Sequence, residues 1–177
     1  MKVLVAYASA AGSTKGIAEF IGEKLRGHEI EVDVQDVNSA KNLEGYDAFV
    51  IGSALYRFHW LNEAKQFVSN NKSILASRPV WIFSSGPTGT KTTDAKGRDL
   101  REVSGPKEIE ELRKKINPRD HRVFFGALYR DRLKGTVGWF ARWIPKDAEG
   151  DFRNWNEIES WTNSIVQSLL GLKATVR

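Results

Sequence analysis

The chain is predicted to be an α/β protein with a doubly wound parallel sheet, because short apolar runs alternate along it with segments of helical periodicity. The runs at residues 2–8, 46–53 and 79–84 are almost continuously apolar, which is typical of parallel strands buried on both faces. Each of these runs ends in small and hydroxyl-bearing residues. Sheets of this class bind ligands at the carboxyl ends of their strands, so we expect these three places to form one site.

Five strands are expected in this sheet. Four are apolar runs, whereas residues 31–37 alternate valine with polar residues, as a strand at or near a sheet edge does. The predicted strands cover residues 2–8, 31–37, 46–53, 79–84 and 122–128.

The segments between the strands repeat apolar residues at a spacing of three or four, which predicts helices. These helices are expected from near residue 15, from 61 up to 70–71, at 106–116 and from 154 onward. Pro106 suits the first turn of the third helix, and Asn154 with Glu157 has the spacing of a capping box at the start of the last.

Length and composition exclude several classes of protein. The 177 residues, 41% of them hydrophobic, suit a single domain over residues 1–177. The sequence lacks an apolar run of about 18 residues that could span a bilayer, and it enters a strand at once, so we expect a cytoplasmic protein. It has no cysteine, which excludes thiol chemistry, and its three histidines are too far apart in sequence to predict a metal site.

The net charge of +5 is unevenly distributed. Residues 113–146 contain ten Lys or Arg and two acidic residues, a net +8, so the rest of the chain carries −3. Such a segment suits an anionic partner: a membrane surface, nucleic acid, a polycarboxylate substrate or an acidic protein. The alternative is a solvated basic face without a partner.

The junction between the first strand and the first helix, Ser9-Ala10-Ala11-Gly12-Ser13-Thr14, is interpreted as a phosphate-binding loop. The first N–H groups of a helix have no intrahelical partner and favour an anion, and three hydroxyls can donate to phosphate oxygens. The alternative is a tight turn with an N-cap and no ligand. The loop has neither the three glycines of a dinucleotide fingerprint nor a Gly-Lys-Ser/Thr sequence, which disfavours a nucleoside triphosphatase.

Ser9, Ala11, Gly12 and Thr14 match the phosphate loop of the flavodoxin-like family, which this chain resembles. The resemblance implies a five-stranded parallel sheet of order 2-1-3-4-5 and FMN as cofactor, with the phosphate on the first loop and the ring between the other two. The residues expected to bind FMN are Ser9, Ala10, Ala11, Gly12, Ser13, Thr14, Ser53, Ala54, Leu55, Tyr56, Ser84, Ser85, Gly86, Pro87 and Thr88. Tyr56 is expected to stack on the ring, and Trp60 to pack in the core.

Flavodoxins that act as soluble carriers are strongly acidic around the flavin, and this chain is not. Residues 50–59, 126–145 and 149–155 are similar to the menaquinone-dependent protoporphyrinogen dehydrogenase branch of the family. That resemblance implies an enzyme that passes electrons from a reduced organic donor, with protoporphyrinogen IX as the candidate, through FMN to a quinone.

A basic, tryptophan-containing segment, 130–146, is inserted before the last helix. It predicts either an amphipathic element that contacts an anionic membrane surface or a lid over the flavin. A basic lid would also suit an anionic small-molecule substrate.

Two other functions compete with the enzyme. One is an electron-transfer protein that docks on a redox partner without a substrate of its own. The other is a flavin-free protein that binds another phosphate or nucleic acid, although interleaved basic and aromatic residues at helical spacing disfavour nucleic acid. No catalytic residue is assigned, because the flavin supplies the chemistry and His59 suits a surface role better than a proton transfer.

Overall fold

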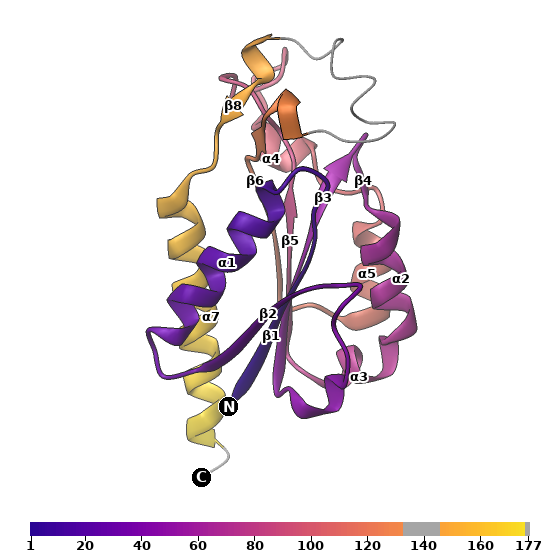
Figure 1. Ribbon diagram of the computed structural model, residues 1–177, viewed down its shortest axis with the longest axis vertical. Helices are drawn as coiled ribbons and strands as arrows, with labels where there is room; N and C mark the ends of the chain where they lie inside the picture. The colour runs from indigo at the N-terminus through magenta and orange to yellow at the C-terminus, as the bar shows by residue number, and fades with distance from the viewer. Residues whose placement is uncertain (133–145, 176–177) are drawn as a thin grey trace.

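A parallel sheet forms the centre of the computed structural model, which describes residues 1–132 and 146–175 (Figure 1). Its strands are β1 (Lys2–Ala8), β2 (Glu31–Asp36), β3 (Ala48–Tyr56), β4 (His59–Trp60), β5 (Val80–Ser85) and β6 (Asp120–Phe124). The parallel strands lie in the order β2-β1-β3-β5-β6, and β4 pairs with β3 in the antiparallel sense. Because β5 and β6 are the fourth and fifth predicted strands, the predicted order is confirmed.

Helices cover both faces of the sheet. They are α1 (Ser13–Arg26), α2 (Asn62–Asn70), α3 (Lys72–Ser77), α4 (Leu100–Val103), α5 (Ile109–Ile116) and α7 (Trp155–Thr175), with 3-10 turns η1 (Leu43–Gly45), η2 (Arg130–Arg132) and η4 (Lys146–Ala148). Figure 1 shows α1 and α7 on one face and α2, α3 and α5 on the other. A small hairpin of β7 (Ala127–Leu128) and β8 (Gly150–Asp151) lies at the end of the molecule to which β1 and β3 point.

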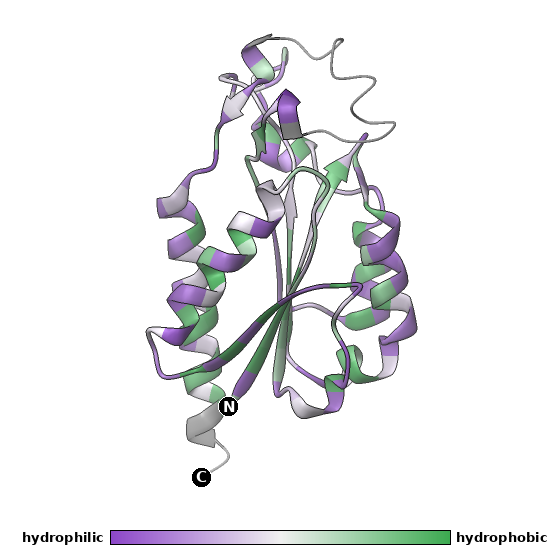
Figure 2. Cartoon of the chain, in the orientation of Figure 1, coloured by the Kyte–Doolittle hydropathy of each residue, from purple (hydrophilic) through white to green (hydrophobic). Residues whose placement is uncertain are grey.

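The core consists of two layers separated by the sheet, because alternate residues of each buried strand point to opposite faces. Val3 and Val5 pack in the layer with α1 and α7, whereas Leu4 and Ala6 pack in the layer with α2. Figure 2 shows apolar strands between helices that are apolar toward the sheet and polar outward. This burial on both faces explains the continuous apolar runs in the sequence.

Two strands end elsewhere than predicted. β3 continues past Ser53 to Tyr56 because it pairs with β4 in a hairpin. The run predicted at 122–128 is divided, because the Gly126 N–H donates to the Pro87 carbonyl (2.9 Å) and the Gly126 carbonyl accepts from the Phe152 N–H (3.1 Å). These bonds take the chain away from the sheet after β6.

Two helix starts are also informative. α5 begins at Ile109 and not at Pro106, because residues 106–109 form a turn closed by the hydrogen bond from the Ile109 N–H to the Pro106 carbonyl (3.0 Å). In α7, Asn154 caps the helix by accepting from the Glu157 N–H (3.2 Å), as predicted. The Glu157 carboxylate, which a capping box would return to Asn154, instead accepts from Arg101 (2.9 Å).

The predicted membrane or lid segment 130–146 lies outside the described residues except at 130–132 and 146. Within residues 1–132 and 146–175, no helix has the length and apolar content needed to cross a bilayer. The same residues contain no group of three or more His, Asp or Glu side chains that could hold a metal ion.

Candidate functional site

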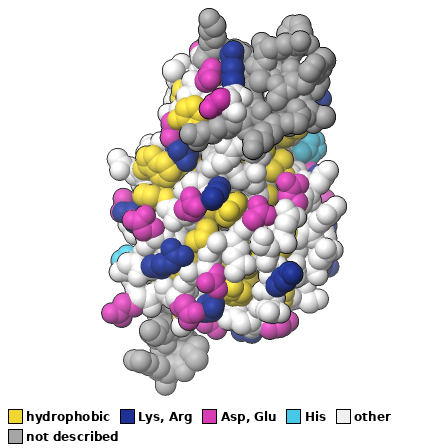
Figure 3. Space-filling view, viewed as in Figure 1, with side chains coloured by type: hydrophobic (Ala, Val, Ile, Leu, Met, Phe, Trp, Pro, Cys, Tyr) yellow, Lys and Arg dark blue, Asp and Glu magenta, His cyan; other side chains and the backbone are white. Residues whose placement is uncertain are grey.

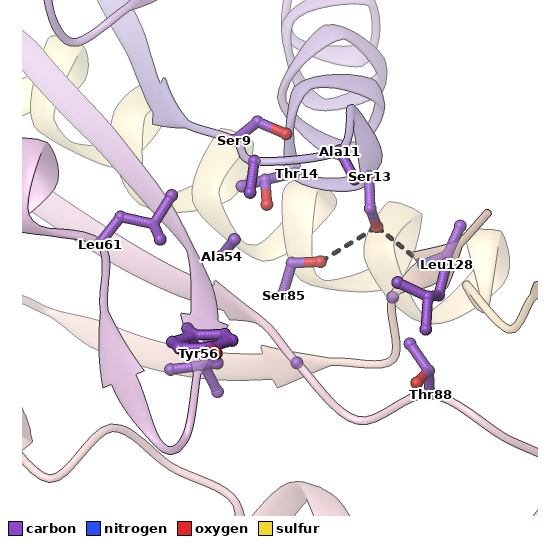
Figure 4. A pocket seen from close by; sticks show the side chains of 15 residues that line it. Ser9, Ala11, Ser13, Thr14, Ala54, Tyr56, Leu61, Ser85, Thr88 and Leu128 are labelled. Atoms are coloured by element: carbon purple, nitrogen blue, oxygen red, sulfur yellow. Dashed lines mark hydrogen bonds between the residues drawn. The ribbon is translucent and has the colours of Figure 1, made fainter. Parts of the chain in front are cut away.

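A cavity of about 200 Å³ opens at the carboxyl ends of the parallel strands. Four segments surround it: the β1–α1 loop, the β3–β4 hairpin, the loop after β5 and the chain after β6 (Figure 4). Its lining residues are Ser9, Ala10, Ala11, Ser13, Thr14, Ala54, Leu55, Tyr56, Leu61, Ser85, Gly86, Thr88, Gly126, Ala127 and Leu128. None of these described residues carries a charged side chain, so the cavity suits a largely apolar ligand with a few polar contacts.

Most of the predicted cofactor residues lie on this wall, but Gly12, Ser53, Ser84 and Pro87 do not. Ser53 is fully buried, and its hydroxyl donates to the Ala54 carbonyl (2.9 Å) and accepts from the Leu61 N–H (3.0 Å). Ser53 therefore does not face the cavity but holds two residues that line it, Ala54 and Leu61, in place.

Ser84 is likewise fully buried, and its hydroxyl bonds to Trp60 Nε1 (2.8 Å) and His121 Nε2 (3.0 Å). Trp60 is 1% exposed, so its predicted place in the core is confirmed. Burial, with a further contribution from the nearby Arg113 guanidinium, lowers the pKa of His121 to about 4. His121 is therefore neutral at pH 7.

The β1–α1 loop has the geometry of an anion-binding turn. Gly12 has a φ of +88°, a conformation that favours glycine, and its N–H donates to Ser9 Oγ (3.0 Å). Thr14 is fully buried, and within the described residues its Oγ1 has no hydrogen-bond partner. Figure 4 shows this side chain pointing from α1 toward the space between Ala54 and Ser85. An unpaired hydroxyl beside the open N–H groups of a helix start fits a phosphate.

Ser13, predicted as a phosphate donor, joins three of the four segments. Its Oγ accepts from the Ala127 N–H (2.8 Å) and lies 3.2 Å from Ser85 Oγ (Figure 4). A Cβ at position 126 would lie 3.2 Å from Ser85 Oγ and 3.3 Å from Ser13 Oγ, so a side chain there would press on both hydroxyls. Leu61 and residues 126–128 were missed from sequence because their place depends on the hairpin and on these long-range bonds.

The β3–β4 hairpin carries the exposed aromatic side of the cavity. Tyr56 lines the cavity and is 47% exposed, which leaves its ring accessible to a planar group. The Arg57 guanidinium carbon lies 5.7 Å from the centre of the Tyr56 ring. Arg57 and Phe58 both have positive φ, +51° and +64°, which is uncommon for residues other than glycine.

Basic and acidic side chains occur together near the end of the molecule that contains the cavity. Figure 3 shows Lys or Arg and Asp or Glu interspersed over the visible described surface. Arg130 pairs with Glu149 at 3.2 Å, and Arg153 pairs with Asp151 at 2.5 Å. The Arg153 guanidinium, with burial opposing it, holds the pKa of Asp151 below its usual range through a side-chain hydrogen bond.

Comparison with known proteins identifies relatives of two kinds. A family model described as a flavodoxin domain matches residues 4–148. Protoporphyrinogen IX dehydrogenase (quinone) of Escherichia coli strain K12 is 29% identical over 86 residues, which are 48% of this chain and 48% of that protein. The same enzyme from E. coli O157:H7 gives the same values. The match thus spans about half the length of these curated relatives.

Solved flavodoxins share the fold. A mutant flavodoxin from Pseudomonas aeruginosa has a TM-score of 0.60 at 13% identity, with 96% of this chain and 99% of that chain covered. A flavodoxin from the domain Archaea has a TM-score of 0.57 at 18% identity, with 95% and 98% covered. The matched domain indicates FMN as the cofactor, and the unpaired Thr14 hydroxyl and the loop around Gly12 fit its phosphate. Because the family model covers most of its length, the chain belongs to the flavodoxin domain family.

Proposed function

We propose that this chain is an FMN-dependent oxidoreductase that passes electrons from a reduced organic donor through the flavin to a quinone, with protoporphyrinogen IX as the donor. The observation that carries the proposal is the uncharged cavity with the exposed face of Tyr56 at its side, which suits a large, planar organic molecule. The name of the partly matching E. coli relatives supports the choice of donor and acceptor.

The chain's own residues would bind and orient the cofactor. Residues 9–14 would hold the phosphate, with the Thr14 hydroxyl as a donor. The lining residues Ala54, Leu55, Tyr56, Ser85, Gly86 and Thr88 would frame the ring. Tyr56 would stack on the ring and keep water from one face of it. When bound, FMN supplies the redox chemistry, so these residues need not include a nucleophile.

The proposed electron acceptor, a quinone, also suggests where in the cell the protein acts. We propose a cytoplasmic protein that reaches the cytoplasmic face of the membrane through residues 130–146, where a quinone would be available. The basic residues and tryptophans of that segment support this contact. A basic lid over an anionic substrate is the alternative role for the same residues.

A flavodoxin-type electron carrier is the second candidate. The family and the solved flavodoxins fit a protein that docks on a redox partner and turns over no substrate of its own. Tyr56 and Phe58 of the β3–β4 hairpin, which are 47% and 50% exposed, would then contact the partner.

One anaerobic experiment separates these functions. The protein is loaded with FMN, passed through a desalting column and mixed with protoporphyrinogen IX, and the flavin absorbance is followed before and after addition of menadione. Bleaching by the porphyrinogen and recovery with the quinone are expected for the enzyme. Reduction by NADPH with a flavodoxin reductase, without reaction with protoporphyrinogen, would support the carrier. A protein that loses FMN on the column would contradict both.

A further inference from the structure

Oxidation of a porphyrinogen-like donor by hydride transfer leaves an N–H proton that needs an acceptor. In a two-electron step that breaks one C–H and one N–H bond, the donor forms one new C=N double bond. The C–H hydrogen would pass to the FMN as hydride, which carries two electrons and one proton, and the N–H proton would pass to a base. Among the described residues that line the cavity, Tyr56 alone has an ionisable side chain, and a neutral phenol is a poor proton acceptor at pH 7.

The β3–β4 hairpin places a histidine beside this wall. Tyr56 pairs directly with His59 across the hairpin, and such opposed residues point to the same face. His59 thus lies next to Tyr56 and two residues before Leu61, both of which line the cavity. Its side chain is 45% exposed, so water can reach it.

A carboxylate forms a hydrogen bond with this histidine. His59 Nδ1 lies 2.6 Å from Glu108 Oε1, and the Glu108 side chain is only 14% exposed. Lys65 Nζ lies 3.5 Å from the same oxygen, while Glu108 Oε2 is buried and has no hydrogen-bond partner in the described residues. Burial acts to raise the pKa of Glu108, but the His59 hydrogen bond, a backbone hydrogen bond and the nearby basic side chains together outweigh it and lower the pKa.

A carboxylate oxygen can only accept a hydrogen bond when ionised, so the contact with Glu108 places a proton on Nδ1 and leaves Nε2 as the nitrogen that can accept another. The local backbone secures this arrangement. The Lys107 N–H donates to the Phe58 carbonyl (2.9 Å), which ties the tip of the hairpin to the residue before Glu108. The hairpin also keeps Arg57 and Phe58 at positive φ, a costly conformation of the kind often found at functional sites.

We propose that His59 Nε2 accepts the N–H proton of the organic donor and passes it to water, and that Glu108 is the positioning residue that holds the imidazole in this tautomer. The inference rests on the proposed function and names a proton acceptor for it. The charged groups that face His59 are Glu108 from the segment before α5 and Lys65 from α2, with Arg57 on the neighbouring turn.

The test is stopped-flow reduction of the FMN-loaded protein by protoporphyrinogen IX and, separately, by dithionite. General-base catalysis contributes about 10²- to 10⁴-fold, so His59→Gln should slow the porphyrinogen reaction at least about 10-fold. The dithionite rate and the FMN affinity should not change, because dithionite delivers electrons without losing an N–H proton. The exposed His28 provides the matched control, and His28→Gln should behave as wild type.

Two further readouts separate a proton acceptor from a structural contact. Imidazole added to His59→Ala should restore part of the porphyrinogen rate. Nitrogen NMR of the FMN-free protein should show His59 with its proton on Nδ1, and Glu108→Gln should change this tautomer preference.

The contrary outcomes are distinct. Wild-type porphyrinogen rates in His59→Gln, or equal slowing of both reductants, would overturn the role of His59 and leave the proposed function intact. A proton on Nε2 of neutral His59 would overturn it as well. A wild-type protein that reacts with dithionite and not with protoporphyrinogen would overturn both the donor and this inference.

Discussion

Gly12 is the residue on which the shape of the phosphate loop depends most directly. Its φ is +88°, and nothing lies within 4 Å of the position that a Cβ would take, so a side chain there is opposed by backbone strain and not by a neighbour. Gly12→Val should therefore displace the loop from around Thr14 and abolish FMN binding. The strain should also lower the unfolding free energy of the FMN-free protein by about 1–2 kcal/mol.

Gly97 provides a matched control for this substitution. It has a φ of +76° and the same open surroundings, but it lies in the connection between β5 and α4 and not in the β1–α1 loop. Gly97→Val should lose similar stability in a urea titration and keep wild-type FMN affinity in a fluorescence titration. Equal FMN affinity in the two valine variants would contradict the role of the loop.

His121 provides a prediction on pH. Its pKa in the folded protein is about 4, chiefly because it is buried, against about 6.5 in an unfolded chain. Between these values the unfolded state binds more protons than the folded state, so the unfolding free energy should fall as the pH drops from 6.5 to 4. We expect a loss on the order of 2 kcal/mol, measured by urea unfolding at a series of pH values.

His121→Gln is the comparison for that series, because an amide can still bond to Ser84 without titrating. The variant should show a smaller fall over the same pH range. The carboxylates with lowered pKa, such as Asp99 at about 2, begin to lose their stabilisation near their unfolded pKa and do so alike in both proteins, so the difference between the two series reports His121. An identical fall in the variant would assign the pH dependence to other groups.

The β3–β4 hairpin is the element that sequence reasoning missed. Its two central residues need positive φ, and Asn-Gly is the usual sequence for such a turn, so Arg57-Phe58 gave no signal. The apolar run at 46–53 predicted the buried part of β3, but the two-residue β4 is too short to detect from periodicity.

The same turn yields a prediction on stability. Replacing Arg57-Phe58 by Asn-Gly should raise the unfolding free energy by about 1 kcal/mol, because both positions then suit positive φ and the replaced Phe58 is 50% exposed. Urea unfolding of the FMN-free protein measures this change. Arg78→Asn, at an exposed residue with extended backbone, is the control and should leave the stability unchanged. A less stable double variant would mean that Phe58 contributes packing that outweighs the strain.

At the scale of the whole molecule, local patterns predicted the buried strands because each is recognisable by itself, whereas their order was predicted from the resemblance to the flavodoxin-like family. The local patterns also located the loops of the site, because parallel strands bring their carboxyl ends to one edge of the sheet. They could not distinguish Ser85, on the wall, from Ser84, whose hydroxyl is used by Trp60 and His121. That distinction depends on contacts between residues distant in the chain. The chain after β6 was missed for the same reason.

The cavity joins four segments between residues 9 and 128, so FMN should stabilise the whole fold and not one loop. At 100 times its dissociation constant a ligand adds about 2.7 kcal/mol, which should raise Tm by roughly 5–10 °C in a thermal melt. Riboflavin carries the same ring without the phosphate and is the control. It should raise Tm less at equal concentration, because the N–H groups at the start of α1 and the Thr14 hydroxyl then have no anion to bind. Equal shifts with the two ligands would show that the β1–α1 loop does not bind the phosphate.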